Sequence, residues 1–80
     1  MRSSATLLRA LVLVYGFFPA KSSTDLCTKV SAAVETVKLD ASLEKALLAK
    51  VAEIFVCEGQ TLRVNALFEE MLRLIAAQKA

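Results

Sequence analysis

Only two glycines and one proline interrupt this 80-residue chain, and their scarcity restricts its fold more than any other feature. Glycine and proline are the residues that most often mark turns and the ends of helices. Gly16 and Pro19 stand close together near the N-terminus, and Gly59 stands alone in the second half. The long stretches between them leave little room for the many turns of a β-architecture. The sequence therefore predicts an all-α protein, a small three- to four-helix bundle made of helical hairpins.

Four segments have the residue spacing of amphipathic helices. Apolar residues that recur at i, i+3, i+4 and i+7 lie on one face of an α-helix. This spacing predicts helices over residues 3–18, 24–38, 41–57 and 61–78. The second segment is rich in threonine and valine, whose branched side chains lower helix propensity. It lacks the strict period-two alternation of a strand, so a helix remains the better interpretation.

Polar residues and a glycine mark the ends of the third and fourth segments. The side chain of Asp40 or Ser42 can accept a hydrogen bond from a free amide at the start of the third helix, and Thr61 can do so for the fourth. Gly59 suits a left-handed turn because it has no Cβ to clash with the backbone. We therefore expect the last two segments to form a hairpin with a tight turn at residues 58–60.

The fourth segment carries a broad apolar stripe. Hydrophobic residues make up 56% of the chain, above the roughly 45–50% of ordinary soluble domains. Since a small bundle has little room to bury this surplus, we expect part of it to pack against another protein. The residues expected to bind that partner are Val64, Leu67, Phe68, Met71 and Ile75. The alternative for the same stripe is the core of the chain itself.

The N-terminal segment, residues 1–22, is apolar and basic. It contains Arg2, Arg9 and Lys21 and no acidic residue. It has three interpretations: a secretory signal peptide that ends at residues 20–22, a mitochondrial presequence, or the first helix of the bundle. The chain is therefore divided into this segment, which is either a targeting sequence or a first helix, and a helical domain over residues 23–80.

The same segment bears on membrane association. Its uninterrupted apolar run is about half of the roughly 20 residues that a transmembrane helix needs. A spanning helix is therefore not expected. A helix over residues 3–18 could instead lie on a membrane surface, with its arginines on a narrow polar stripe.

The two cysteines, Cys27 and Cys57, are candidates for a disulfide bond. If the second and third segments form an antiparallel hairpin that turns near residues 39–42, the two thiols lie side by side at its open end. A bridge there would stabilise the chain by roughly 3 kcal/mol, because it closes a long loop in the unfolded state. It requires an oxidising compartment. The alternative is two free thiols packed as small hydrophobic residues.

The chain contains no histidine, which removes the usual general base and the commonest metal ligand. Two distant cysteines cannot complete a structural zinc site on their own. The only adjacent carboxylates, Glu69 and Glu70, lie on the polar side of a predicted helix, as solvated residues usually do. We expect no enzyme, no catalytic residue, no metal site and no cofactor.

The sequence favours a non-catalytic accessory or scaffolding subunit that packs by amphipathic helices within a larger protein assembly, with mitochondria as the expected compartment. The alternative is a secreted helical miniprotein with one disulfide that acts as a binding or signalling factor. The net charge of +2 is small and its basic residues are not clustered, so no nucleic-acid partner is expected. The oligomeric state is left open.

Overall fold

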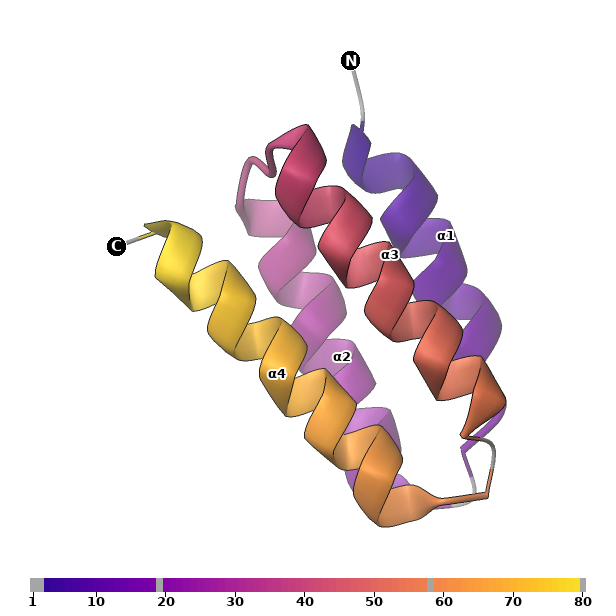
Figure 1. Ribbon diagram of the computed structural model, residues 1–80. Coiled ribbons are helices and arrows are strands. Elements are labelled where there is room, and N and C mark those ends of the chain that lie inside the picture. The colour runs from indigo at the N-terminus through magenta and orange to yellow at the C-terminus, as the bar shows by residue number, and fades with distance from the viewer. Residues whose placement is uncertain (1–2, 19, 58, 80) are drawn as a thin grey trace.

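The computed structural model describes residues 3–18, 20–57 and 59–79, and these form four α-helices (Figure 1). They are α1 (Ser3–Tyr15), α2 (Lys21–Thr36), α3 (Ala41–Val56) and α4 (Thr61–Lys79). The prediction of a small all-α bundle is confirmed, and residues 3–15 form its first helix.

Successive helices alternate in direction, and the chain forms two hairpins, α1–α2 and α3–α4 (Figure 1). The hairpins pack side by side so that α1 lies along α3 and α2 lies along α4. Neighbouring helices are therefore antiparallel within a hairpin and parallel between hairpins. The pairs α1 with α4 and α2 with α3 lie on the two diagonals and do not pack against each other.

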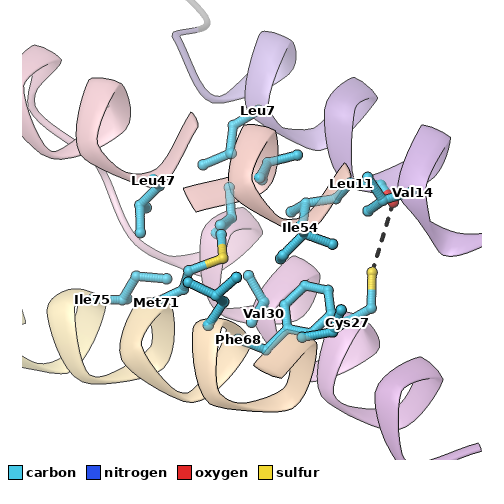
Figure 2. Packing of buried hydrophobic residues seen from close by; sticks show 14 of the residues in the cluster. Leu7, Leu11, Val14, Cys27, Val30, Leu47, Ile54, Phe68, Met71 and Ile75 are labelled. Atoms are coloured by element: carbon cyan, nitrogen blue, oxygen red, sulfur yellow. Dashed lines mark hydrogen bonds between the residues drawn. The ribbon is translucent and has the colours of Figure 1, made fainter. Parts of the chain in front are cut away.

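A single apolar core fills the space between the helices (Figure 2). Every helix contributes large side chains that are almost completely buried in this core. They include Leu7, Leu11, Val14, Val30, Val34, Leu47, Ile54, Phe68 and Met71. The Phe18 ring, which follows α1, meets the Phe68 ring edge to face at 5.5 Å. Since α1 shares this core with the other helices, residues 3–18 and the rest of the chain form one packing unit.

The helix ends follow local sequence signals in two of three places. The Asp40 carboxylate accepts a 2.7 Å hydrogen bond from the backbone N–H of Leu43, so Asp40 caps α3 as expected. Gly59 has a φ of 87°, the left-handed backbone that its turn was expected to need. Thr61 differs from the prediction: it is the first residue of α4, and the Val64 amide bonds to the carbonyl of Gln60 instead.

Helix α2 begins three residues earlier than the predicted 24–38 and ends two residues earlier. No side chain caps its start at Ala20. Within the first turn the Lys21 ammonium lies 3.4 Å from the Asp25 carboxylate, an i,i+4 pair. The threonine hydroxyl of Thr24 bonds back to the Ala20 carbonyl. These contacts form only once the helix exists. Helix propensity alone does not include them, and the predicted start of this helix was therefore too late.

Polar contacts at both ends fix the alignment of α2 and α4. At the start of the two helices, the buried Ser23 hydroxyl donates to the Asn65 carboxamide oxygen at 2.6 Å, and Asn65 donates to the Ser22 hydroxyl at 3.1 Å. At the far end, the Gln78 amide donates to the Lys38 carbonyl at 2.6 Å. Since the pairs join start to start and end to end, they confirm that α2 and α4 run parallel.

The diagonal placement of α2 and α3 corrects the hairpin on which the disulfide prediction depended. Cys27 lies on α2 and Cys57 directly follows α3, and both are buried free thiols. The Cys27 thiol bonds instead to the Leu11 carbonyl of α1, with the sulfur 3.7 Å from the oxygen (Figure 2). The structure therefore gives no support to a Cys27–Cys57 bridge.

Candidate docking surface on the first helix

The five residues expected to bind a partner lie inside the chain's own core. Exposed fractions are 4% or less for Val64, Leu67, Phe68, Met71 and Ile75. The total accessible surface of 5002 Å² is close to the roughly 4,700 Å² expected for a compact chain of 8.7 kDa. In the folded chain the α4 stripe is therefore covered by α2 and α3, as the alternative expectation of a core within the chain has it.

Two adjacent large apolar side chains are left uncovered by the fold on the outer side of α1. Val12 is 73% exposed and Leu13 is 64% exposed, and together with Leu8 and Arg9 they line a shallow apolar depression. Because positions i, i+3 and i+4 share one helix face, Arg9, Val12 and Leu13 form one outward stripe of α1. We call these three residues the α1 surface.

Helix α1 thus carries one stripe on its inner side and one on its outer side. Leu7, Leu11 and Val14 point into the core and are fully buried, while the α1 surface points away from it. A helix that is apolar on two opposite sides is normally covered on both. The signal was present in the sequence, where Arg9 is the only charged residue between positions 3 and 18. It was missed because a targeting segment explained the same apolarity.

Aromatic side chains extend the apolar area toward α3. The half-exposed Phe17 ring packs edge to face on the Phe55 ring of α3, with centroids 5.2 Å apart. Val56 at the end of α3 is 83% exposed. Tyr15, the last residue of α1, is also exposed. The Phe17–Phe55 pair therefore adds exposed apolar area close to the carboxyl-terminal end of α1.

The one charge on the α1 surface is Arg9, which lies between Val12 and Leu13 on the outward face. Its side chain is exposed, and it forms no ion pair with any residue that the structure describes. The last turn of α1 contains no basic residue. The carboxyl end of a helix carries partial negative charge, and at this end of α1 the Phe17 amide donates to the Val14 carbonyl.

The surface where α3 meets α4 carries an ion pair and differs in character from the α1 surface. Lys50 of α3 and Glu70 of α4 form an ion pair with a 2.5 Å separation between nitrogen and oxygen. This hydrogen bond raises the pKa of Lys50 above its ordinary 10.5 and lowers the pKa of Glu70 below its ordinary 4.5. Arg63 and Arg73 lie close enough to lower the Glu70 pKa further. This face is typical of solvated helix surfaces.

The buried Cys27 thiol has a raised pKa. Burial raises its pKa from 9.0 to about 11, and a hydrogen bond from Ser31 opposes this only in part. Because the thiolate is the reactive form of cysteine, the raised pKa keeps Cys27 as the less reactive thiol at neutral pH. The placement fits the alternative expectation of free thiols packed as small hydrophobic residues.

In the described part of the chain, no three histidine, cysteine or acidic side chains gather where they could hold a metal ion. None of the helices described is both long and apolar enough to cross a bilayer. Comparisons of the chain with protein-family models, curated proteins and solved structures find no match. The candidate site therefore depends on the geometry of the α1 surface alone.

Proposed function

We propose that this protein is a non-catalytic accessory or scaffolding subunit that docks onto another protein through the α1 surface. The observation that carries the proposal is the exposure of Val12 and Leu13 on a helix whose opposite side is fully buried. Leaving two large aliphatic side chains in water forgoes about 1.5–3 kcal/mol of favourable burial for each. A partner that covers them recovers that free energy.

The position of Arg9 favours a protein over a lipid surface. If α1 lay flat on a bilayer, Arg9 would point into the membrane between Val12 and Leu13. Helices that lie in the interface keep their charged residues on the side away from the lipid, and a charge inside the bilayer is costly. A protein surface can instead offer a carbonyl or carboxylate to the guanidinium.

The packing of α1 supports its retention in the working protein. Cleavage near residues 20–22 would remove Leu7, Leu11 and Val14 from the core and expose the sides of α2 and α3 that they cover. An uncleaved segment is compatible with localisation to mitochondria, and this localisation remains part of the proposal. The secreted miniprotein remains the second candidate, but the free thiols remove the disulfide that favoured it.

Site-specific photo-crosslinking in the native host tests the docking role. A photoreactive residue at Leu13 is expected to give a discrete adduct of higher mass with another polypeptide. The same residue at Leu62, which is 86% exposed on α4, is the matched control and should give none. Equal yields at both positions, or no adduct at Leu13, would contradict the proposal.

The mass of the endogenous chain tests whether the N-terminal segment is retained or cleaved as a targeting sequence. An intact N-terminus, allowing for loss of the initiator methionine, with two free thiols is expected for the retained form. A chain that begins near residue 21–24 would show instead that α1 is removed, and with it the docking surface.

A further inference from the structure

The shallow depression on α1 is a groove between two rows of side chains. Residues four apart line up along a helix, so Leu8 and Val12 form one row and Arg9 and Leu13 form the next. These four residues line the depression. When two helices pack, a row of side chains from one helix lies in such a groove of the other, and the helices commonly cross at about 50°. The groove therefore has the form of one half of a helix–helix contact.

The lining of this groove is apolar except for Arg9. Val12 and Leu13 are mostly exposed, and the partly buried Leu8 packs against the core below them. A helix that fills the groove has to present aliphatic side chains four positions apart. Its other faces meet water, so the fitting partner is an amphipathic helix.

Arg9 determines the charge of that helix. It is two positions from both Leu7 and Leu11, which point into the core, and two positions turn an α-helix by roughly 200°. Arg9 therefore points away from the bundle, in the middle of the surface that a partner has to cover. Residues 1–22 contain no acidic residue, and Arg9 forms no ion pair with any residue that the structure describes. A guanidinium that is covered without a partner loses its hydration and gains nothing in return.

The partner has to supply the missing acceptor for Arg9. Backbone carbonyls within a helix are already bonded to amides of the same helix, so the acceptor on a helical partner is a side chain. A carboxylate fits best because it carries the opposite charge and can accept two parallel hydrogen bonds from a guanidinium. We infer that the α1 surface binds an acidic amphipathic helix of another protein, with an aspartate or glutamate on Arg9. The inference rests on the proposed docking role and names the chemistry of the partner.

Charge reversal at Arg9 tests the inference in the native host, with the photoreactive residue at Leu13 as the probe. Arg9→Glu in that chain should lower the adduct yield about tenfold or more, because it brings two carboxylates together. Arg9→Lys keeps the charge and loses the paired hydrogen bonds, so its yield should lie between the two. Lys45→Glu makes the same change in net charge at an exposed site on α3 and should leave the yield unchanged. Circular dichroism verifies that each variant remains folded.

The site of the adduct on the partner provides a second measurement. Peptide mapping by mass spectrometry should place the crosslink in a segment with aliphatic residues four apart and an acidic residue within one helical turn. Replacing that acidic residue by arginine should lower the yield with the wild-type Arg9 and restore it with Arg9→Glu. A loss of folding in either protein cannot produce this exchange.

The outcomes separate this inference from the proposed function. No adduct at Leu13 would overturn both, whether or not the purified chain co-sediments with anionic vesicles. An adduct whose yield Arg9→Glu leaves unchanged, or a crosslinked segment without an acidic residue, would overturn the inference and leave the docking role intact. An adduct with twice the mass of this chain would identify a second copy as the partner and would also overturn the inference.

Discussion

The hydroxyl of Ser23 in α2 donates a 2.6 Å hydrogen bond to the carboxamide oxygen of Asn65 in α4. Ser23 is the one buried polar side chain among the residues that the structure describes. Its partner comes from a helix that begins some 40 positions later in the sequence. Together with the Asn65–Ser22 bond beside it, this bond specifies which turn of α2 faces which turn of α4.

Removing Asn65 should therefore cost more than its partly exposed position indicates. Asn65→Leu leaves the Ser23 hydroxyl buried without its partner, and we expect a loss of about 1–3 kcal/mol in the free energy of unfolding, measured in urea. Adding Ser23→Ala removes the orphaned group and should recover part of the loss. A double-mutant cycle with no coupling between the two positions would contradict this account.

Substitutions on the inner side of α1 should reduce stability, whereas substitutions on its outer side should not. Leu11→Ala is expected to destabilise the chain by about 2–5 kcal/mol because it leaves a cavity in the core. Leu13→Ala, two residues away and exposed, should change the free energy of unfolding by no more than about 0.5 kcal/mol. Both are measured by urea unfolding at concentrations where the chain is monomeric. Equal effects would show that α1 is not docked as described.

The Lys50–Glu70 pair should produce a small dependence of stability on pH. The Glu70 pKa is lowered in the folded state, so its contribution is present above pH 4.5 and is lost as the pH falls through the folded value. The Lys50 pKa is raised, so its contribution is present below pH 10.5 and is lost at higher pH.

The variant Glu70→Gln should therefore be less stable than wild type near pH 7, and the difference should shrink in acid. The neighbouring exposed Glu69 provides the control Glu69→Gln, which has no ion pair to lose among the described residues. Thermal unfolding across the pH range is the measurement. A difference that grows in acid would mean that the Glu70 pKa is raised by folding and not lowered.

The two thiols should be free and slow to react. We expect the intact mass of the chain to be the same before and after reduction, and both cysteines to be alkylated once the chain is unfolded. In the folded state Cys27 should react more slowly than Cys57, because it is less exposed and its pKa is raised to about 11. Single-cysteine variants assign the two rates. A mass two hydrogens lower before reduction would reveal a bridge.

The two glycines should respond differently to alanine. Gly59→Ala places a Cβ on a backbone with φ of 87° and should cost about 1–2 kcal/mol, although nothing nearby blocks the methyl group. Gly16→Ala meets neither strain nor a neighbour and should be neutral, or stabilising by up to about 1 kcal/mol. Urea unfolding of both variants checks the contrast, and equal losses would contradict it.

Local patterns were sufficient to predict the helices and one of their caps. The i,i+3,i+4 spacing, the Asp40 side chain and the missing Cβ of Gly59 act over a few residues, so the sequence carries them directly. The order of the helices around the bundle depends instead on contacts between residues far apart in the sequence. Leucine and valine stripes fit many neighbours, and nothing near Cys27 or Cys57 indicates that α2 and α3 lie on a diagonal.

The candidate site was harder to predict for the same reason. The stripe of α4 that includes Phe68 and Met71 has the same spacing whether the chain or a partner covers it, and only the packed structure shows that the chain does. The outward stripe of α1 was obscured by its neighbours, since apolar residues lie on both the inner and the outer side of that helix. Burial, which separates Leu11 from Leu13, is a property of the assembled fold.

The arrangement of the two hairpins also has a consequence for how the molecule is joined. Residues 37–40 are the sole covalent link between the α1–α2 half and the α3–α4 half, and each half presents its apolar side to the other. Neither half alone has anything to cover that side, so each should be unstructured by itself. Mixed as separate peptides, the two halves should bind each other and form the bundle. Residues 37–40 only keep the halves close together, while the packing of α1 on α3 and of α2 on α4 holds them in place.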